Sequence, residues 1–377
     1  MFNAGQKRIL SLDGGGIMGM VSLQFLKRME DQLRPLSGRG DQFRLSDFFD
    51  YIGGTSTGAI IAAGLAIGKS VDEIIDFYDA SGREMFTKAP LYRRLWYSYR
   101  AKPLQKKLQA IIGTKSVLEM QENGELRTLL CVVLRNASTD SPWPITTNPK
   151  AKFNDPQSIH CNMKLPLWQL VRASTAAPTF FQPEVIRVGD RDFSFVDGGV
   201  TPYNNPAFLL FKLATLPQFG LLWPKGEGKL MLVSVGTGLA FDPMQEISTQ
   251  GKSLLTTAAT ITGEVMRGIQ VENDINCRTV GRCVAGAEID SELGDMISHE
   301  PLANDLGGQF LYARYDADLS LEGLAELGCK DIAPKSLRMD SVDKIPDLKR
   351  IGQSAAARQV DLPRQFAPFM PDSRQAA

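Results

Sequence analysis

The sequence predicts an α/β fold in which a mostly parallel sheet is flanked by helices, with a mainly helical C-terminal extension packed on that core. Two observations lead to this prediction. Short apolar runs alternate with segments of helical apolar period through the first two thirds of the chain, which is typical of parallel strands joined by helices. In addition, glycine-rich turns follow the apolar runs that end near residues 12 and 54, and each turn comes directly before a helical pattern.

The elements follow from the same periodicities, taken in chain order. Strands are expected near residues 8–12, 49–54, 128–134, 184–188, 192–197 and 229–235. Helices are expected near residues 17–33, 57–67, 71–80, 104–112, 166–173 and 205–214, and the first of them repeats apolar side chains such as Val21, Phe25 and Met29 at helical spacing. Beyond residue 250, helices are expected over 254–271, 321–327 and 345–360, and a strand over 309–315.

The domain organisation follows from the absence of any low-complexity linker. We expect a core over residues 1–240 and an extension over 241–361 that packs on it. Residues 362–377 are rich in proline and polar groups, so they are expected to form a flexible tail.

Composition limits the classes of function. The chain has 377 residues, of which 43% are hydrophobic, so it can bury a large core. Lys plus Arg equals Asp plus Glu at 42 each, so the net charge argues neither for nor against an anionic partner. We expect no DNA or RNA partner. The five cysteines form no ligand-spaced cluster with the two histidines, so we expect reduced thiols, a cytoplasmic protein and no metal. The longest apolar stretch, near 59–67, is shorter than the roughly 20 residues that cross a bilayer, so any membrane contact is expected to be peripheral.

A G-x-S-x-G motif spans residues 54–58 between a predicted strand and an apolar helix. This sharp turn lifts a serine hydroxyl off the end of a sheet, which makes Ser56 the candidate nucleophile. The alternative interpretation is an ordinary tight turn that opens the following helix. The flanking strand and helix favour the catalytic interpretation.

The glycine run Gly14, Gly15 and Gly16 follows the first predicted strand and precedes a helix. Free N–H groups at a helix N-terminus stabilise negative charge, so these residues are candidates for an oxyanion hole. The same run also matches the dinucleotide-binding pattern G-x-G-x-x-G, for which Glu30 or Asp31 would be the ribose-binding acid. That acid normally ends a second strand, whereas 30 and 31 fall within the first predicted helix, so the oxyanion interpretation is favoured.

A serine nucleophile needs a base, and the histidines at 160 and 299 both lie in polar, irregular segments. Asp197, in a D-G-G segment after a predicted strand, is the other candidate, although the same segment taken alone would indicate a hairpin turn. The order Ser56, Asp197, His299 also leaves a histidine triad open.

Taken together, the three glycine-flanked segments resemble those of the patatin-like phospholipases, and the resemblance continues through 167–178 and 234–238. It implies a three-layer α/β core, Ser56 as nucleophile, Asp197 as sole base, and Gly14, Gly15 and Gly16 as oxyanion donors. It also implies hydrolysis of lipid esters without a metal or organic cofactor. Met18 departs from the family pattern, which usually has a basic residue at that position.

More narrowly, the chain resembles bacterial patatin-like effectors of anti-phage (CBASS) signalling, on the Ser141-Pro142-Trp143 segment, Asn148-Pro149 and the extension around 312–315. That resemblance implies a cytoplasmic enzyme that is activated by a cyclic di- or trinucleotide and degrades membrane phospholipid. It also implies peripheral contact with the membrane when the enzyme is active. The resemblance leaves open whether the protein forms a homo-oligomer. The alternatives are a soluble carboxylesterase, with or without a His299 triad, and a nucleotide-sensing scaffold with weak catalysis.

A basic segment with interleaved aromatics spans residues 91–102. Its pattern suits a lipid headgroup surface or a phosphate-bearing nucleotide, and Arg93, Arg94 and Arg100 are the candidate ligands. The alternative is ordinary packing, in which the aromatics point inward and the cations face water.

Overall fold

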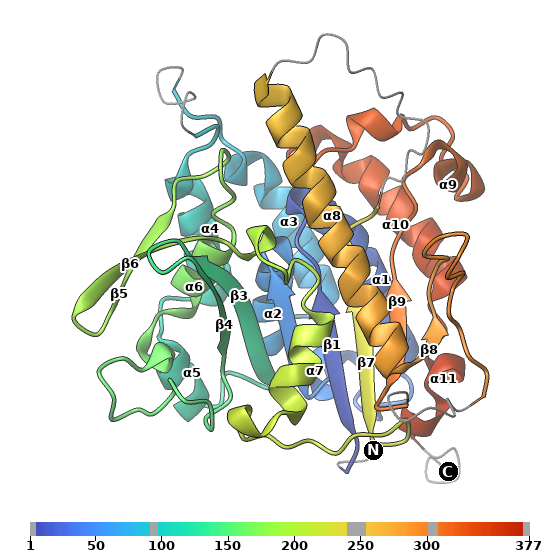
Figure 1. Ribbon diagram of the computed structural model, residues 1–377, viewed down its shortest axis with the longest axis horizontal. Helices are drawn as coiled ribbons and strands as arrows, with labels where there is room; N and C mark the ends of the chain where they lie inside the picture. The colour runs from blue at the N-terminus through green and yellow to red at the C-terminus, as the bar shows by residue number, and fades with distance from the viewer. Residues whose placement is uncertain (1–4, 91–96, 240–253, 301–307, 372–377) are drawn as a thin grey trace.

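A twisted central sheet organises the molecule in the computed structural model, which describes residues 5–90, 97–239, 254–300 and 308–371 (Figure 1). Among these residues nine strands form one sheet, in the order β5-β6-β3-β2-β1-β7-β9-β8, and β4 also pairs with β3. The strands are β1 (Lys7–Leu12), β2 (Tyr51–Thr55), β3 (Leu129–Asn136), β4 (Ser141–Thr146), β5 (Glu184–Val188), β6 (Arg191–Asp197), β7 (Leu230–Val235), β8 (Arg282–Ala285) and β9 (Leu311–Tyr315). The pairs from β3 through β2, β1, β7 and β9 to β8 are parallel, and those of β3 with β4 and β6 and of β5 with β6 are antiparallel.

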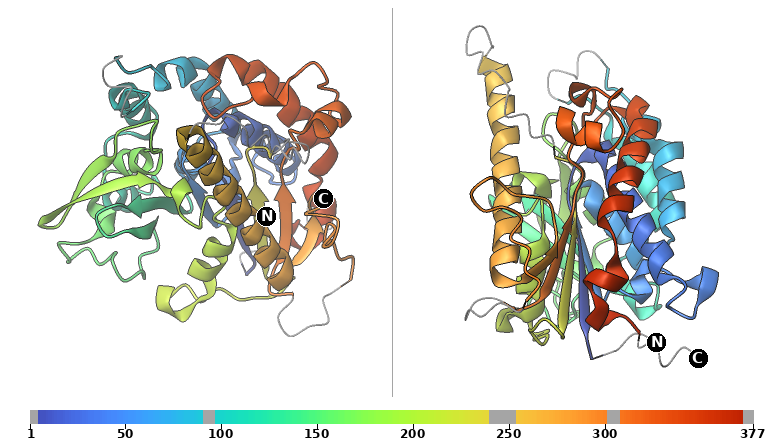
Figure 2. Two further views of the ribbon diagram at one scale, coloured as in Figure 1. Left: turned by 45° about the horizontal axis from the view of Figure 1, so that its top comes forward. Right: turned by 90° about the vertical axis from the view of Figure 1, so that its right-hand side faces the viewer.

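Helices cover both faces of the sheet, which gives three layers (Figure 2). One face packs against most of the helices: α1 (Gly19–Leu33), α2 (Thr57–Ala66), α3 (Val71–Met85), α4 (Ala101–Ile112), α5 (Val117–Glu122), α6 (Leu167–Ser174), α9 (Leu321–Glu326), α10 (Ile345–Gln359) and α11 (Leu362–Gln365). The opposite face is covered by α7 (Ala207–Thr215) and α8 (Leu254–Val280). The predicted fold class is therefore confirmed.

The central strands are buried on both sides, as expected for a parallel sheet covered by helices. All six residues of β7 and all ten residues of α2 are buried. Because α2 is built mainly from alanine, glycine and isoleucine, it can pack closely against the sheet and against α6. This helix begins one residue after the candidate nucleophile and fixes its position.

The C-terminal third of the chain completes the sheet. β9 pairs in parallel with β7, β8 pairs with β9, and α10 packs along α1. The extension thus packs on the core as predicted, and it contributes two strands, of which β8 was not predicted. The predicted boundary at residue 240 lies outside the described residues and stays a prediction.

The predicted tail differs from the structure over residues 362–371. Leu362, Phe366 and Phe369 are each 0% exposed, because α11 and the turn after it pack against α1 and the end of the sheet. Three large apolar side chains spaced four and three residues apart are enough to anchor this segment. Residues 372–377 lie outside the described part of the chain.

The unpredicted strand β4 contains Pro142 and Pro144. Proline lacks the N–H that a central strand needs, so the sequence argued against a strand here. β4 pairs with β3 alone, and its other edge is unpaired in the described sheet, which tolerates proline. In the part of the chain that the structure describes, none of the helices has the length and apolar character that a bilayer crossing requires.

Candidate active site

Ser56 lies at the sharp turn between β2 and α2. Its backbone adopts φ 54° and ψ −119°, a conformation that is strained for a residue with a side chain. A side chain at position 54 would overlap the carbonyl of Gly58, and one at position 58 would overlap the carbonyl of Leu12. The two glycines of the motif therefore allow the tight crossing that places the serine at the end of the sheet.

The Ser56 hydroxyl donates a hydrogen bond of 2.6 Å to Oδ2 of Asp197. Asp197 ends β6, and its other carboxyl oxygen accepts a 2.7 Å bond from the N–H of Gly199. Both dyad side chains are buried, at 7% and 2% exposure. The sequence predicted both residues, and the structure brings them together although 141 positions separate them.

Ser174, at the end of α6, is hydrogen-bonded to the backbone of the candidate nucleophile. Its hydroxyl accepts a 2.9 Å bond from the backbone N–H of Ser56 and donates a 2.7 Å bond to the carbonyl of Val133. The hydroxyl thus fixes the strained backbone of the turn to β3. Ser174 lies in the 167–178 segment that resembles the family, but no motif in the sequence indicates a role for this residue.

Burial raises the pKa of Asp197 to about 6, against the opposing effects of the Ser56 hydroxyl, the Gly199 N–H and the Arg172 charge. A carboxylate with this pKa is ionised at neutral pH and is a stronger base than an exposed aspartate. The arrangement can therefore accept the serine proton without a histidine.

The glycine run lies beside the nucleophile, since a Cβ on Gly14 would be 3.2 Å from Cβ of Ser56. The N–H of Gly14 donates a 3.2 Å bond to the carbonyl of Asn204, so it is not available to an oxyanion in this conformation. This differs from the predicted set of three donors. The N–H groups of Gly15 and Gly16 have no acceptor within the described residues and remain available.

The conformation of this loop requires glycine. Gly16 has φ +60°, and a side chain there would overlap the carbonyl of Met339. A side chain on Gly15 would overlap Thr237. The Thr237 hydroxyl in turn donates a 3.2 Å bond to the carbonyl of Gly14. Thr237 and Met339 both come from segments C-terminal to the glycine run, and sequence analysis gave neither a role.

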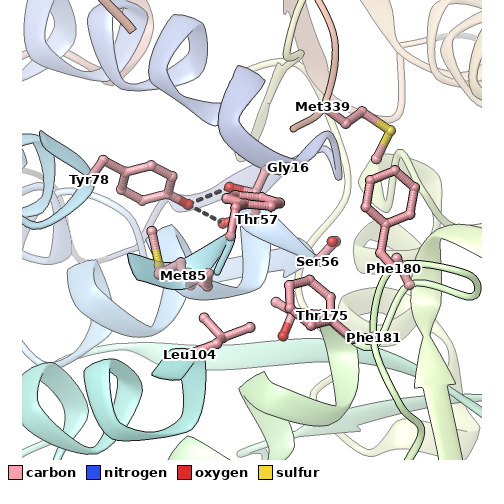
Figure 3. Close-up of a pocket in the computed structure, with 13 residues that line it drawn as sticks. Gly16, Ser56, Thr57, Tyr78, Met85, Leu104, Thr175, Phe180, Phe181 and Met339 are labelled. Atoms are coloured by element: carbon pink, nitrogen blue, oxygen red, sulfur yellow. Dashed lines mark hydrogen bonds between the residues drawn. The ribbon is translucent and has the colours of Figure 1, made fainter. Parts of the chain in front are cut away.

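An apolar pocket opens directly onto Ser56 (Figure 3). Its walls come from α2, α3, α4, the turn after α6 and the segment around residue 339, and its apolar side chains are Ile60, Met85, Phe86, Leu104, Phe180, Phe181 and Met339. Tyr78 closes one side, where its hydroxyl is hydrogen-bonded to Thr57. A pocket of this composition suits a hydrocarbon chain next to the nucleophile.

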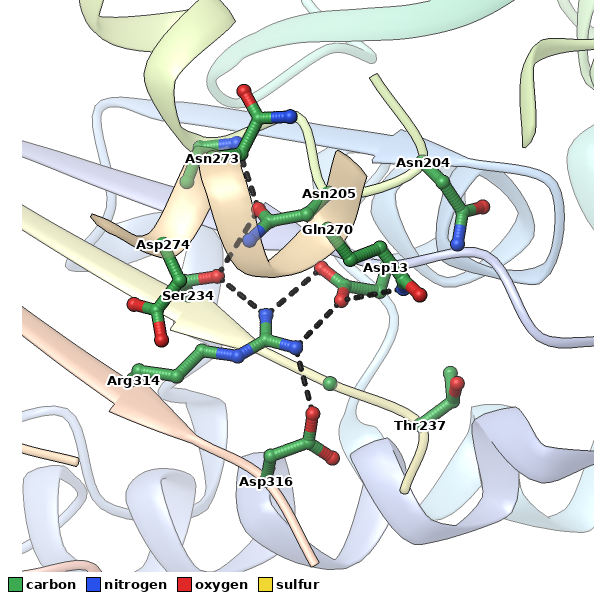
Figure 4. A network of polar contacts seen from close by, with 12 residues as sticks. Asp13, Asn204, Asn205, Ser234, Thr237, Gln270, Asn273, Asp274, Arg314 and Asp316 are labelled. Atoms are coloured by element: carbon green, nitrogen blue, oxygen red, sulfur yellow. Dashed lines mark hydrogen bonds and ion pairs between the residues drawn. The ribbon is translucent and has the colours of Figure 1, made fainter. Parts of the chain in front are cut away.

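A buried network of charges joins Arg314 to Asp13, the residue that precedes the glycine run (Figure 4). Arg314 of β9 donates to both carboxyl oxygens of Asp13, at 3.0 and 2.7 Å, and to Asp316 at 2.6 Å and Ser234 at 2.8 Å. Burial raises the pKa of Asp13 to about 6 and also raises that of Asp316, while Arg314 opposes both effects. Gln270 of α8 donates a further 3.2 Å bond to Asp13. Sequence analysis did not predict this network.

The histidine alternatives are not assembled. His160 and His299 are both exposed, and His299 lines a different cavity together with Arg282 and Gln359. The dinucleotide-binding alternative lacks the acidic residue that would bind the ribose. Glu30 and Asp31 both lie within α1, and Glu30 is hydrogen-bonded to Arg34 and to the N–H of Val71.

The basic segment is only partly described. Arg93 and Arg94 lie outside the described residues. Arg100 is exposed, precedes α4 and lines a groove with Lys102, Lys106 and Tyr97. Glu84 and Tyr99 line the same groove. Met85, which follows Glu84, and Phe86, whose ring packs edge-on against that of Tyr99 with centroids 5.4 Å apart, line the apolar pocket.

Comparisons with known proteins show which families and structures this chain resembles. The sequence model described as "Patatin-like phospholipase" matches residues 10–211. The chain is 32% identical over 215 residues to the cGAMP-activated phospholipase of Vibrio cholerae, covering 54% of this chain and 56% of that protein. It is 30% identical over 247 residues to Patatin-17 of Solanum cardiophyllum, covering 61% and 60%. The chain therefore matches less than two thirds of the length of either relative. Among solved structures, VipD from Legionella pneumophila has a TM-score of 0.33 at 14% identity, covering 92% of this chain and 67% of that one.

Proposed function

Since the chain belongs to the patatin-like phospholipase family, we propose that it hydrolyses the acyl esters of membrane phospholipids through a Ser56–Asp197 dyad. The observation that carries this proposal is the 2.6 Å hydrogen bond between the serine hydroxyl and the buried carboxylate, at the mouth of an apolar pocket. The enzyme class, a serine acyl hydrolase, follows from the family.

In the proposed mechanism, Ser56 attacks the ester carbonyl as its proton passes to Asp197. The negative charge on the carbonyl oxygen is stabilised by the N–H groups of Gly15 and Gly16. Asp197 then gives its proton to the leaving alkoxide, which departs as the lysolipid alcohol. A water molecule attacks the acyl-enzyme and passes a proton through Asp197 to the serine oxygen, which releases the fatty acid. No metal or organic cofactor takes part in these steps.

The lining of the site supports a lipid substrate. We propose that the apolar pocket holds the acyl chain and that the groove around Arg100 and Lys106 faces the lipid phosphate. Arg93 and Arg94 stay part of this proposal, with their role untested. Because the groove residues Glu84 and Tyr99 adjoin pocket residues Met85 and Phe86, one phospholipid could contact both regions.

We further propose that a cyclic di- or trinucleotide activates the enzyme in anti-phage defence, and that the protein acts on the membrane peripherally from the cytoplasm. The similarity to a cGAMP-activated phospholipase supports activation by a nucleotide of this class. A resting state would protect the producing cell's membrane, and a homo-oligomer would be one way to build the active state.

The test is hydrolysis of phospholipid vesicles by the purified protein, with and without a panel of cyclic nucleotides. We expect slow release of fatty acid alone, a steep rise with one nucleotide, and no release by Ser56→Ala under any condition. Activity on short soluble esters without activity on vesicles would favour the carboxylesterase alternative. Nucleotide binding without turnover of either substrate would favour the scaffold alternative.

A further inference from the structure

A second cavity opens where the C-terminal half of α1 meets β8, β9 and the connection from α10 to α11. Its charged lining consists of four arginines and one aspartate: Arg28, Arg282, Arg358, Arg364 and Asp361. We call it the arginine cavity. Among the described residues it shares no lining residue with the apolar pocket at Ser56. Four guanidinium groups against one carboxylate make its lining strongly positive.

Three of these arginines, Arg28, Arg358 and Arg364, form no ion pair with any described residue. Arg282 is paired with Glu227 at 2.7 Å, and Arg358 donates to the carbonyl of Glu326. Arg28 and Arg364 are exposed and form no ion pair with any described residue. Guanidinium groups donate two parallel hydrogen bonds to a phosphate, which suits them to bind phosphodiesters.

Half-buried amide side chains stabilise the wall between these arginines. Gln32 of α1 donates to the carbonyl of Val360 at 2.8 Å and accepts from the N–H of Leu362 at 3.0 Å. Gln365 donates to the carbonyl of Gln359 at 2.8 Å and contacts the hydroxyl of Tyr315. The cavity is therefore a fixed feature of the packing between α1 and α10, which lowers the ordering cost of binding a ligand.

We propose that the arginine cavity binds a ligand with two phosphodiester groups, and that it is the site of the nucleotide activator. The second half of this inference rests on the proposed function, whereas the first half depends only on the cavity. Phosphodiesters also occur in lipid headgroups, so the binding experiment must separate a soluble nucleotide from an anionic membrane surface.

The cavity is connected to the oxyanion loop by two routes. Gln359, which lines the cavity, donates a 2.7 Å bond to the carbonyl of Asp316 and accepts a 3.3 Å bond from its N–H. The carboxylate of Asp316 is bonded to Arg314, and Arg314 is bonded to Asp13, the residue before Gly14. The second route is α1 itself, which carries Arg28 and begins three residues after Gly16. A ligand that binds more tightly to one arrangement of these contacts would shift the population of that arrangement.

The binding test uses the full chain and a fluorescent cyclic GMP-AMP, with the other cyclic nucleotides as competitors. We expect Arg28→Ala and Arg364→Ala each to weaken binding about 10- to 100-fold, the range for a lost charge-assisted contact. Arg350→Ala is the matched control, because Arg350 is an exposed arginine of α10 that pairs with Asp331 outside the cavity. Unchanged thermal unfolding of each variant verifies its fold.

Three outcomes of this test would overturn the assignment. These are the absence of binding by every nucleotide, equal binding by the wild type and both variants, and loss of binding in Arg100→Ala instead. A lipid occupant would be indicated if the two variants lost association with phosphatidylglycerol vesicles, but not with phosphatidylcholine vesicles, while no nucleotide bound. The cavity would then be a phosphodiester site without a role in nucleotide activation.

The connection is tested separately with Asp316→Asn, which removes the carboxylate charge that pairs with Arg314 and changes no residue that lines the cavity. We expect this variant to bind the nucleotide within threefold of wild type and to lose most of the activation of vesicle hydrolysis. Full activation of the variant would exclude the route through Asp316. If Ser56→Ala binds the nucleotide normally while the wild-type enzyme shows no hydrolysis, the proposed function fails and the binding site stands.

Discussion

Arg314 donates two hydrogen bonds to the carboxylate of Asp13, from Nη1 to Oδ1 at 3.0 Å and from Nη2 to Oδ2 at 2.7 Å, across 301 positions of sequence. Asp13 is the last residue before the glycine run, and Arg314 belongs to β9, one of the two strands that the extension adds to the sheet. The position of the oxyanion loop therefore depends on the C-terminal third of the chain.

Arg314→Gln should destabilise the protein strongly. It would leave the buried carboxylates of Asp13 and Asp316 without their common counter-charge, and breaking a buried pair in this way costs about 3–5 kcal/mol. Thermal unfolding should show a clearly lower Tm. Arg187→Gln is the matched control, since Arg187 forms a similar two-bond contact with Asp192 on the surface, and we expect its Tm to stay unchanged.

Arg314→Lys keeps the charge but removes the planar fork. We expect kcat on vesicles to fall by about 10²-fold, the effect of a misplacement of about 1 Å, while KM changes little. A normal kcat in the folded variant would show that the contact with Asp13 serves stability alone.

If Ser56 and Asp197 act as the catalytic pair, their variants should lose activity and the histidine variants should keep it. Ser56→Ala and Asp197→Asn should each lower kcat/KM by several orders of magnitude, because each removes a group that acts in the transition state. His160→Asn and His299→Asn should retain nearly full activity, as both side chains are exposed and neither lines the pocket at Ser56. The assay uses a saturating concentration of nucleotide, because His299 lines the arginine cavity. Loss of activity in a folded His299→Asn variant that still binds the nucleotide would restore the triad hypothesis.

The pKa of Asp197, raised to about 6 by burial, predicts the acid limb of the pH profile. Asp197 must be ionised to accept the serine proton, so kcat/KM should fall about tenfold per pH unit below pH 6. A profile that stays flat to pH 4.5 on a non-ionising ester would contradict Asp197 as the base.

The same raised pKa predicts how stability depends on pH. The folded state holds the Asp197 proton more tightly than the unfolded state, whose carboxyl has a pKa near 3.8, so ionisation above that value penalises the folded state. The cost is absent below about pH 4, grows up to about pH 6, and amounts to ~3 kcal/mol at neutral pH. Asp197→Asn should therefore raise Tm at pH 7.5 and leave it unchanged at pH 4. A lower Tm at pH 7.5 would contradict this account.

The oxyanion assignment is tested by Gly15→Ala, whose new side chain would overlap Thr237 and displace the loop. Loss of one oxyanion donor typically lowers kcat by about 10²- to 10³-fold, so we expect a fall of that size with little change in KM. Gly228→Ala is the control, because position 228 is exposed with no neighbour within 4 Å of the added atom. A folded Gly15→Ala enzyme with altered KM alone would exclude this assignment.

The central strands and Ser56 were predictable because each rests on a local signal, whereas Asp197 was assigned through the resemblance to the family, since its segment alone would indicate a hairpin turn. Apolar runs indicated β1, β2, β3 and β7, and a strand-turn-helix pattern indicated Ser56. β4 was missed because Pro142 and Pro144 contradict the usual strand composition, and β8 because four residues carry too little pattern. The partners of Gly14 and Asp13 could not be predicted, since Asn204 and Arg314 reach them only through tertiary packing.

β7 pairs in parallel with both β1 and β9. The part of the chain that must be present for the sheet to form is therefore longer than the part that matches the family model. The family model matches residues 10–211, so its match ends before β7 begins. A chain cut after residue 240 would keep Ser56 and Asp197 but would lose β9. The backbone N–H and C=O groups along one side of β7 would then be unpaired, and an exposed strand edge of this kind promotes aggregation between molecules. Residues 1–240 are therefore not expected to fold stably by themselves. Fusions or shortened versions of this enzyme should retain the chain through Phe369.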